Sequence, residues 1–333
     1  MHSFIEVCAG CGGLSKGFMD AGFQPLLINE IDKTACETLK KNHPHHRGRI
    51  VQGSMTELSL ERCSPDVLMG GVPCQAFSHA GERKGLEDPR GQLILEFNRL
   101  VNECRPKFLL IENVKGLATH EKGKTLESVL ELFSNEGLYK IKYKVLNAKD
   151  YEVPQKRERI IIVGTRSNLN LNYEFPEPSL KKVVLKDVLK NVPQSDGERY
   201  SEEKKKVLDM VPPGGCWVDL PIDVQKAYMG KAFTSGGGRR GMARRLSMEE
   251  QCLTLTTSPA QKQTERCHPN ETRPLTVREY ARIQTFPDDY VFCGSISRQY
   301  RQIGNAVPVM LGIHIARSLQ KTLENAIDQE GIQ

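Results

Sequence analysis

The sequence lacks the features of a membrane, secreted or disordered protein. No apolar run approaches the roughly 20 residues that a bilayer-spanning helix needs. Residues 1–6 show no basic stretch followed by a long apolar one, so we expect no signal peptide. The chain contains no internal repeat and no low-complexity tract. We therefore expect a globular protein of the cytoplasm that does not associate with membranes.

The cysteines lack the spacing of a zinc site. Ten cysteines are scattered along the chain, and the only close pair is Cys8 and Cys11. A structural zinc site would need a second pair or histidines at ligand spacing, and Cys267-His268 stands alone. A disulfide framework is not expected in a long chain without a secretory signal. We expect no metal, although a zinc or redox protein built on Cys8 and Cys11 stays open as an alternative.

The composition is that of an ordinary globular chain with a small excess of positive charge. The 333 residues are 38% hydrophobic and 26% charged, which excludes a disordered class. Lysine and arginine outnumber aspartate and glutamate by 47 to 41, a net charge of +6. This balance allows a polyanionic partner without requiring one.

The first half of the chain alternates short apolar runs with amphipathic stretches. This alternation predicts an α/β fold: a mostly parallel, Rossmann-like sheet flanked by helices. The expected strands are residues 3–7, 25–29, 66–69, 108–111 and 159–164, and the expected helices are 14–21, 33–41 and 93–103.

The composition changes after about residue 168. Between Pro176 and Pro274 the chain is rich in lysine, arginine, glycine, proline and serine, and regular periodicity returns near Leu275 and at residues 307–319. We predict one domain from residues 1–178, completed by 296–333. A second, smaller, loop-rich domain with a basic surface would span 179–295.

A glycine-rich turn, Ala9-Gly10-Cys11-Gly12-Gly13, joins the first expected strand to the first helix. Such a turn lets the backbone approach a ligand closely. Glu30 ends the second strand about 20 residues later, where nucleotide-binding sheets place a ribose-binding carboxylate. The turn lacks the G-x-G-x-x-G spacing that receives a pyrophosphate. A nucleoside without phosphates therefore fits better than a dinucleotide, unless the segment is only a turn.

Two chemically distinctive residues follow neighbouring strands. Cys74, in Gly70-Gly71-Val72-Pro73-Cys74-Gln75, lies on a constrained loop at the carboxyl edge of the sheet, where its thiol can act as a nucleophile. Glu112 follows the apolar run 108–111 at the same edge and can hold or donate a proton. A buried core cysteine and a helix-capping glutamate are the alternatives.

Two arginines precede the last expected strand, in Gln155-Lys156-Arg157-Glu158-Arg159. Strand alternation would put Arg157 and Arg159 on one face, with Glu158 on the other. Two guanidinium groups on one face suit recognition of a carbonyl or a phosphate. A solvated run of charges is the alternative.

These blocks, taken in order, resemble the DNA cytosine-5 methyltransferases, in particular the short bacterial type. The resemblance covers the first roughly 165 residues and returns from Arg273 to the C-terminus. It includes Asp88-Pro89-Arg90-Gly91-Gln92-Leu93, the stretch from Arg273 to Pro287 (R-x-L-T-x-R-E-x-A-x-x-Q-T-F-P), and Gln302-Ile303-Gly304-Asn305-Ala306-Val307-Pro308.

The resemblance implies a mechanism. Cys74 would attack carbon six of a cytosine flipped out of duplex DNA, and Glu112 would contact N3 and the exocyclic amine. Arg159 would hold O2, and Arg157 would support the nucleophile loop. S-adenosylmethionine would donate the methyl group and would be bound by Ala9, Gly10, Cys11, Gly13, Asn29, Glu30, Ile31, Pro73, Leu93, Asn305 and Ala306.

The resemblance also implies that residues 1–178 with 296–333 form the catalytic and cofactor-binding domain, and 179–295 the target-recognition domain. The partner would be duplex DNA with a short recognition sequence. Contacts to DNA are expected from Gln75, Ser78, Arg239, Arg240, Arg244, Arg245, Gln261 and Gln263, within a wider candidate stretch 258–266. We expect a nucleoid-associated monomer, acting with a cognate restriction endonuclease or as an orphan regulator.

The sequence departs from the family at three positions. Cys8 stands where a phenylalanine usually packs on the adenine, Ser54 aligns loosely with an aspartate that recognises the adenine amine, and Val72 replaces a phenylalanine or proline. We therefore expect altered cofactor packing. Methylation of RNA and an inactive DNA-binding homologue are the competing readings, although the Cys-Phe-Thr signature of the tRNA-modifying branch is absent from the sequence.

Overall fold

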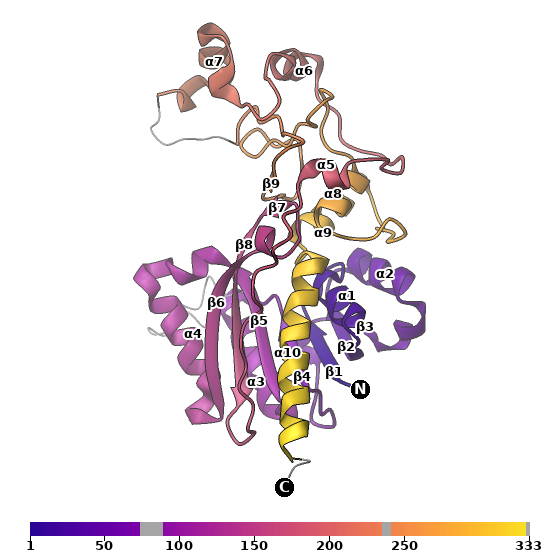
Figure 1. Cartoon of the computed structure of the whole chain (residues 1–333), viewed down its shortest axis with the longest axis vertical. Coiled ribbons are helices and arrows are strands. Elements are labelled where there is room, and N and C mark those ends of the chain that lie inside the picture. The colour runs from indigo at the N-terminus through magenta and orange to yellow at the C-terminus, as the bar shows by residue number, and fades with distance from the viewer. Residues whose placement is uncertain (74–88, 235–240, 331–333) are drawn as a thin grey trace. The chain divides into compact units, whose positions relative to one another are not determined.

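The computed structural model describes residues 1–73, 89–234 and 241–330, which form two compact units (Figure 1). Unit 1 comprises Met1–Tyr151, Glu158–Ser179 and Val307–Gln333, and unit 2 comprises Glu152–Arg157 and Leu180–Ala306. The return to unit 1 comes at Val307 and not at 296, and the segment Glu152–Arg157 belongs to unit 2, which the sequence did not indicate.

Unit 1 is built on a seven-stranded sheet in the order β3-β2-β1-β4-β5-β8-β6. The pairs among β1 to β5 are parallel, and β8 runs antiparallel to both β5 and β6. The predicted mostly parallel α/β sheet is therefore confirmed. The strands are β1 (Ser3–Val7), β2 (Gln24–Glu30), β3 (Ile50–Gln52), β4 (Val67–Gly70), β5 (Phe108–Val114), β6 (Tyr139–Asn147) and β8 (Glu158–Arg166).

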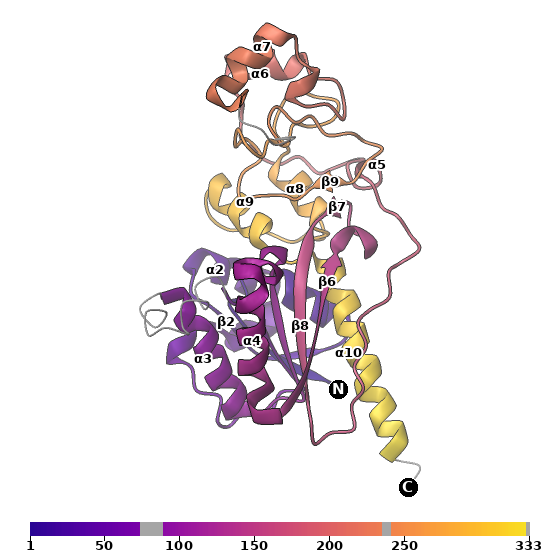
Figure 2. The same cartoon turned by 90° about the vertical axis from the view of Figure 1, so that its left-hand side faces the viewer.

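Helices cover both faces of the sheet (Figure 2). Alternation along β1 and β5 sends Ile5, Leu109 and Ile111 into one hydrophobic cluster with α3 (Pro89–Cys104) and α4 (Lys124–Ser134). The opposite face carries Phe4, whose ring packs on Phe18 of α1 (Gly13–Asp20). Helices α2 (Lys33–Asn42) and α10 (Val309–Glu330) complete the unit.

The C-terminal helix α10 packs against α1 through glycines. A Cβ atom on Gly17 would lie 2.7 Å from the Val309 carbonyl oxygen and 2.8 Å from Gly312 Cα. The two helix backbones therefore touch, as only glycine permits. The sequence-based expectation that the last helix returns to the sheet domain is confirmed.

The edge strand β6 is an element that the sequence analysis missed. Its lysines 140, 142 and 144 alternate along a strand whose central residues are largely exposed. Charged residues of this kind protect an open sheet edge from pairing with another chain, and they also hide the apolar signal of a strand. The short strand β3 and helix α4 were not predicted either.

Unit 2 has little regular structure. It contains β7 (Gln155–Lys156), α5 (Leu185–Val188), α6 (Glu202–Asp209), α7 (Ile222–Met229), β9 (Cys252–Leu253), α8 (Val277–Ile283) and α9 (Ile296–Asn305). Single-turn 3-10 helices lie in unit 1 at Pro44–Arg49, Met55–Glu57, Lys115–Ala118, His120–Gly123, Asn135–Gly137 and Ala148–Asp150, and in unit 2 at Trp217–Asp219 and Gly230–Ala232. Among the described helices of both units, none is long and apolar enough to cross a membrane.

Candidate active site

An ion pair between neighbouring strands forms the centre of the candidate site in unit 1. Arg159 Nε lies 2.8 Å from Glu112 Oε1, and each side chain is only 12% exposed. β5 continues to Val114, so Glu112 lies inside the strand and not just beyond its end as predicted. In the antiparallel register Val114 faces Arg159. Alternation then puts Glu112 and Arg159 on the same face of the sheet.

The segment that leads to Cys74 is fixed beside this pair. Asn113 donates its side-chain amide to the Val72 carbonyl at 2.8 Å, and Val72 is fully buried. A Cβ atom on Gly71 would lie 3.4 Å from Glu112 Oε2, so the chain passes close to this carboxylate. Cys74, Gln75 and Ser78 lie outside the described residues. Asn113 is a positioning residue that the sequence analysis did not single out.

Backbone N–H groups of the glycine-rich turn donate hydrogen bonds to the Glu30 side chain and the Asn29 carbonyl at the end of β2. Gly10 N–H donates to Glu30 Oε2 at 2.7 Å, and Asp32 N–H donates to Oε1 at 2.8 Å. Ala9 N–H donates to the Asn29 carbonyl at 3.1 Å. The predicted group of residues 9–13, Asn29 and Glu30 is thus one cluster, held at the carboxyl ends of two parallel strands.

This cluster fits a nucleoside. A Cβ atom on Gly10 would meet nothing within 4 Å, so a ligand can approach the backbone there. Glu30 is 8% exposed and its oxygens can still accept from ribose hydroxyl groups. The next residue, Ile31, is 69% exposed and offers an apolar side chain next to the turn. Cys11 and Gly13 are buried, so they support the turn from the interior of unit 1.

Glu6, a buried carboxyl group under the turn, was missed by the sequence analysis. It lies in the middle of β1 and is 2% exposed. Burial raises the pKa of Glu6 to about 8, against the opposing effect of the Ser15 hydroxyl, and the Glu30 and Glu112 carboxylates raise it further. A single acidic residue inside the apolar run Phe4-Ile5-Glu6-Val7 was the available signal, because charged residues are rare in doubly covered parallel strands.

The remaining residues predicted near the cofactor have distinct environments. Pro73 is exposed, and Leu93 on α3 packs against the main hydrophobic cluster. Ser54 accepts from Thr56 N–H and caps a single-turn helix. Cys8 has φ 53° and its sulfur lies 3.9 Å from that of Met55. Burial raises the pKa of Cys8 to about 12.

Arg157 does not share a strand face with Arg159, so that prediction is wrong. Arg157 is 1% exposed and lies in unit 2, before β8 begins. Its Nη1 donates to the Leu255 carbonyl at 3.2 Å and its Nη2 to the Gly304 carbonyl at 2.9 Å. These carbonyls draw the side chain into the interior of unit 2. Asn305 is exposed at the end of α9, and Ala306 is 9% exposed.

The predicted DNA-contacting residues also separate into two groups. Arg245 is 6% exposed, and its Nη2 donates to the Leu208 carbonyl and the Thr272 hydroxyl, each at 2.7 Å. It is an internal brace of unit 2 and not a surface contact, which corrects the prediction. Gln261 and Gln263 are exposed, and Arg244 lies 3.5 Å from Glu250 at the surface. Arg239 and Arg240 lie outside the described residues.

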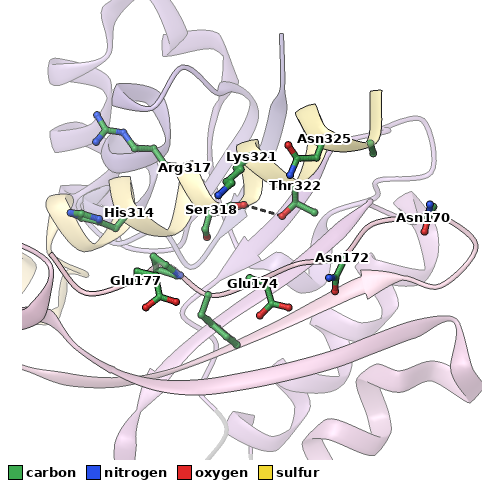
Figure 3. Close-up of a pocket in the computed structure, with 13 residues that line it drawn as sticks. Asn170, Asn172, Glu174, Glu177, His314, Arg317, Ser318, Lys321, Thr322 and Asn325 are labelled. Atoms are coloured by element: carbon green, nitrogen blue, oxygen red, sulfur yellow. Dashed lines mark hydrogen bonds between the residues drawn. The ribbon is translucent and has the colours of Figure 1, made fainter. Parts of the chain in front are cut away.

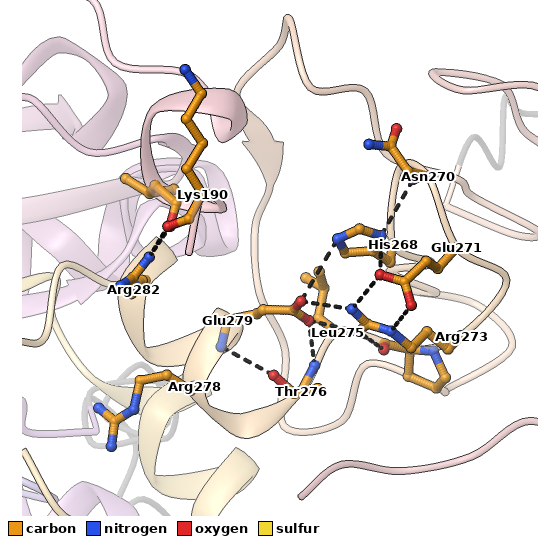
Figure 4. A network of polar contacts seen from close by, with 12 residues as sticks. Lys190, His268, Asn270, Glu271, Arg273, Leu275, Thr276, Arg278, Glu279 and Arg282 are labelled. Atoms are coloured by element: carbon orange, nitrogen blue, oxygen red, sulfur yellow. Dashed lines mark hydrogen bonds and ion pairs between the residues drawn. The ribbon is translucent and has the colours of Figure 1, made fainter. Parts of the chain in front are cut away.

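The block from Arg273 to Pro287 is structural (Figure 4). Arg273 makes two hydrogen bonds of 2.8 Å to the two carboxylate oxygens of Glu279, and Glu271 pairs with its Nε at 3.0 Å. Thr276 and Glu279 form a capping box at the start of α8. His268 Nε2 lies 3.6 Å from the same carboxylate. The block therefore stabilises unit 2.

A separate pocket of about 780 Å³ lies within unit 1, between α10 and residues 170–177 (Figure 3). Its lining mixes His314, Arg317 and Lys321 with Glu174 and Glu177. None of the predicted site residues lines it. We do not associate this pocket with the reaction.

A family comparison decides the identity of the chain. The sequence model of the C-5 cytosine-specific DNA methylases matches residues 2–321. The chain belongs to this family. As a C-5 cytosine-specific DNA methylase it is a DNA (cytosine-5-)-methyltransferase, and the enzymes of this family use S-adenosylmethionine.

Relatives of the methylase agree with this assignment. Type II methyltransferase M.Eco47II of Escherichia coli is 51% identical over 335 residues, covering 97% of this chain and 80% of the relative. Type II methyltransferase M.Sau96I of Staphylococcus aureus is 50% identical, covering 96% and 75%. A prophage-encoded E. coli protein, assigned as a DNA modification methyltransferase, superimposes with a TM-score of 0.72 at 27% identity and covers 97% of this chain and all of that one.

A more distant structure shows the fold alone. DNMT2 of Spodoptera frugiperda has a TM-score of 0.69 at 17% identity and covers 96% of this methylase and all of its own chain. Its similarity supports the architecture of the sheet and helices, and it carries no argument about substrate.

Proposed function

We propose that this methylase modifies C5 of a flipped cytosine in a specific duplex DNA sequence, through a covalent adduct of Cys74. The observation that carries the proposal is the Glu112–Arg159 ion pair beside residues 71–73, the segment that leads directly into Cys74. A carboxyl group and a guanidinium side by side at the carboxyl end of β5 can bind the polar groups of a pyrimidine ring. Glu112 would face N3 and the amine, and Arg159 would hold O2.

The cofactor in this proposal binds at the glycine-rich turn of unit 1. Glu30 accepts hydrogen bonds from the ribose hydroxyl groups of the cofactor. Ile31 packs on the adenine, because the family's usual phenylalanine is replaced here by Cys8. The other residues assigned to the cofactor are Ala9, Gly10, Cys11, Gly13, Asn29, Pro73, Leu93, Asn305 and Ala306. S-adenosylmethionine supplies a methyl group on a positively charged sulfur, which a turn without phosphate ligands can accommodate.

The proposed reaction proceeds in four balanced steps. The Cys74 thiolate would add to C6 while Glu112, in its protonated form, would give its proton to N3, so that the ring becomes nucleophilic at C5. S-adenosylmethionine, held at the glycine-rich turn, would supply the methyl group to C5 and would leave as a neutral thioether. Water removes the C5 proton. The C6–sulfur bond would finally break as N3 returns its proton to Glu112, which restores the ring double bond and the thiolate.

Access to the base requires extrusion from the duplex, because C5 and C6 cannot be reached inside the stack. We assign target recognition to residues 179–295, in unit 2. The exposed side chains Gln261, Lys262 and Gln263 support this, since amides and amines read base edges and phosphates. Gln75, Ser78, Arg239, Arg240 and Arg244 remain proposed contacts, whereas buried Arg245 is withdrawn.

The biological role that fits best is protection of host DNA in a restriction-modification system. Two relatives support this role, since M.Eco47II and M.Sau96I are both named Type II methyltransferases. We therefore propose a cognate restriction endonuclease as partner and a monomeric enzyme acting on nucleoid DNA. An orphan regulatory role is the alternative, and bisulfite sequencing of DNA from expressing cells would define the modified sequence.

A mechanism-based trap tests the proposal. With S-adenosylmethionine present, duplex DNA that contains 5-fluorocytosine in the modified sequence should become covalently attached to the intact protein, because fluorine at C5 blocks release. Cys74→Ser should abolish both the adduct and methyl transfer. Cys63→Ser, which alters a partly exposed cysteine outside the site, should keep both. The absence of an adduct with intact protein, or methyl transfer to tRNA alone, would reject the proposal.

A further inference from the structure

We propose that Gln155, Arg157 and Gln284 act together as positioning residues for residues 304–306, and through them for binding of the cofactor. None of the three touches a reacting atom in this scheme. The inference rests on the proposed function, because that proposal places Asn305 and Ala306 at the cofactor. All three side chains are buried in unit 2, at 0%, 1% and 0% exposure.

The two glutamines form a continuous chain of hydrogen bonds. Gln155 Nε2 donates to Gln284 Oε1 at 2.8 Å, and Gln155 Oε1 accepts from Leu255 N–H at 2.9 Å. Gln284 Nε2 donates to the carbonyls of Ile303 at 2.7 Å and Ala306 at 3.1 Å. Each amide thus uses both its donor and its acceptor, so rotation of either amide by 180° would face like groups against each other.

Arg157 joins the same segments from a second direction. It bridges the carbonyls of Leu255 and Gly304, so both ends of the network meet at the C-terminal turn of α9. The backbone of α9 is closely packed at this turn. A Cβ atom on Gly304 would lie 2.1 Å from the Thr256 carbonyl oxygen, which means that the α9 backbone lies directly on residues 256 and 257.

The network lies next to both points at which the chain passes between the two units, so its geometry affects the segments that follow. Arg157 is the last residue of its unit 2 segment, and Ala306 is the last residue before the chain enters unit 1. Arg159 follows two residues after the first crossing, and α10 begins soon after the second. The network therefore fixes, within unit 2, the chain ends from which the catalytic strand β8 and the helix α10 start.

A buried polar network that is fully satisfied specifies one arrangement, and a partly satisfied one permits several. Loss of a glutamine amide should therefore loosen residues 304–306 without removing any cofactor contact directly. Small displacements of a positioning group change binding and rate strongly, by about tenfold to 100-fold. The expected signature is a raised KM for the cofactor with unchanged affinity for DNA.

The test uses the full chain with Gln284→Met, Gln155→Met and the double variant. Methionine keeps the length of glutamine and removes both hydrogen-bonding groups. We expect each single variant to raise the KM for S-adenosylmethionine about tenfold, and the double variant to add little more, because both singles break the same chain. The dissociation constant for duplex DNA, measured without cofactor, should stay within about twofold of wild type.

The matched control is Leu208→Ala, which destabilises the separate hydrophobic cluster of unit 2. Assays run well below the unfolding midpoint of every variant separate positioning from folding. Gln155→Glu and Gln284→Glu add a test of chemistry, because each keeps one acceptor and loses its donor, and each should match or exceed the effect of methionine.

Each outcome is decisive. If Leu208→Ala raises the cofactor KM as much as Gln284→Met at equal loss of stability, the network is merely structural and the inference fails. If the intact enzyme traps 5-fluorocytosine but the glutamine variants keep the wild-type KM, the inference fails while the proposed function stands. If the intact enzyme forms no adduct and transfers no methyl group, the proposed function itself fails.

Discussion

Arg159 and Glu112 share a partly desolvated ion pair across two antiparallel strands, with 2.8 Å between Nε and Oε1. Just beyond the end of β5, Lys115 forms another ion pair with Glu158, the first residue of β8, at 3.0 Å, but their side chains are 54% and 44% exposed. Water screens the second pair much more than the first. The two pairs therefore offer a matched comparison between a buried and an exposed ion pair, both of which join the β5 segment to the start of β8.

Glu112→Gln should reduce methyl transfer by about 100-fold or more, because the amide cannot neutralise charge that develops on the pyrimidine ring. Single-turnover transfer of labelled methyl groups to duplex DNA measures the effect. Glu158→Gln breaks the exposed pair with Lys115 and should leave the rate nearly unchanged. Equal losses in both variants would show that the strand register matters and not the Glu112 charge.

Much of this site could be predicted from sequence because its residues follow apolar strands. Glu30 and Glu112 are identified by short runs of local sequence, and the order of the strands then brings them to one edge of the sheet. The same reasoning failed for Arg157. Its partners, the carbonyls of Leu255 and Gly304, lie 98 and 147 residues away along the chain, so no local pattern shows that it leaves the strand.

The sequence analysis also failed to identify polar side chains that are buried in the fold. Arg245 was predicted to contact DNA because it lies among other basic residues, yet it is buried and donates to Leu208, His268 and Thr272. Gln155 and Gln284 are 129 residues apart and each looks like an ordinary surface residue in the sequence. Such pairs depend on packing between distant segments, which composition and periodicity do not encode.

Glu6→Gln should make stability less dependent on pH. The pKa of Glu6 rises from 4.5 to about 8 in the folded chain through burial. The folded state therefore binds this proton more tightly, and the free energy of unfolding should fall as the pH rises from 4.5 to about 8. The variant removes this loss and should be more stable than wild type at alkaline pH.

Urea denaturation of the cofactor-free protein at several pH values measures this difference. Glu37→Gln alters an exposed glutamate on α2 and should follow the wild-type curve. A Glu6→Gln curve parallel to wild type across the whole range would show that the carboxyl group does not hold its proton on folding.

Arg273→Met should destabilise unit 2 by about 3 kcal/mol, since it leaves the Glu279 carboxylate buried without its main partner. Burial alone would raise the pKa of Glu279, but the hydrogen bonds from Arg273 and Thr276 outweigh it and lower that pKa. The pair therefore stabilises the fold above pH 4.5, the unfolded value, and this contribution is lost as the pH falls through the lowered pKa.

Thermal unfolding of wild type and Arg273→Met at neutral and acidic pH tests both parts. The difference between the two proteins should be largest near neutrality and should shrink in acid. Arg301→Met, an exposed substitution on α9, should change little at any pH. A difference that stays constant through the acid range would mean that the ionised pair is not what stabilises this part of unit 2.

Gly304→Ala sets two effects of opposite sign against each other. Within a helix, alanine is favoured over glycine by about 1 kcal/mol. The added methyl group would, however, lie 2.1 Å from the Thr256 carbonyl oxygen, and a backbone atom cannot move aside as a side chain can. Overpacking of this kind costs about 3 kcal/mol or more, so the steric collision should outweigh the gain in helix propensity.

Gly48→Ala, where a Cβ meets nothing within 4 Å, should be neutral. Limited proteolysis across unit 2 and the urea midpoint distinguish the outcomes, and a Gly304→Ala protein as stable as wild type would show that α9 is not seated against residues 256 and 257.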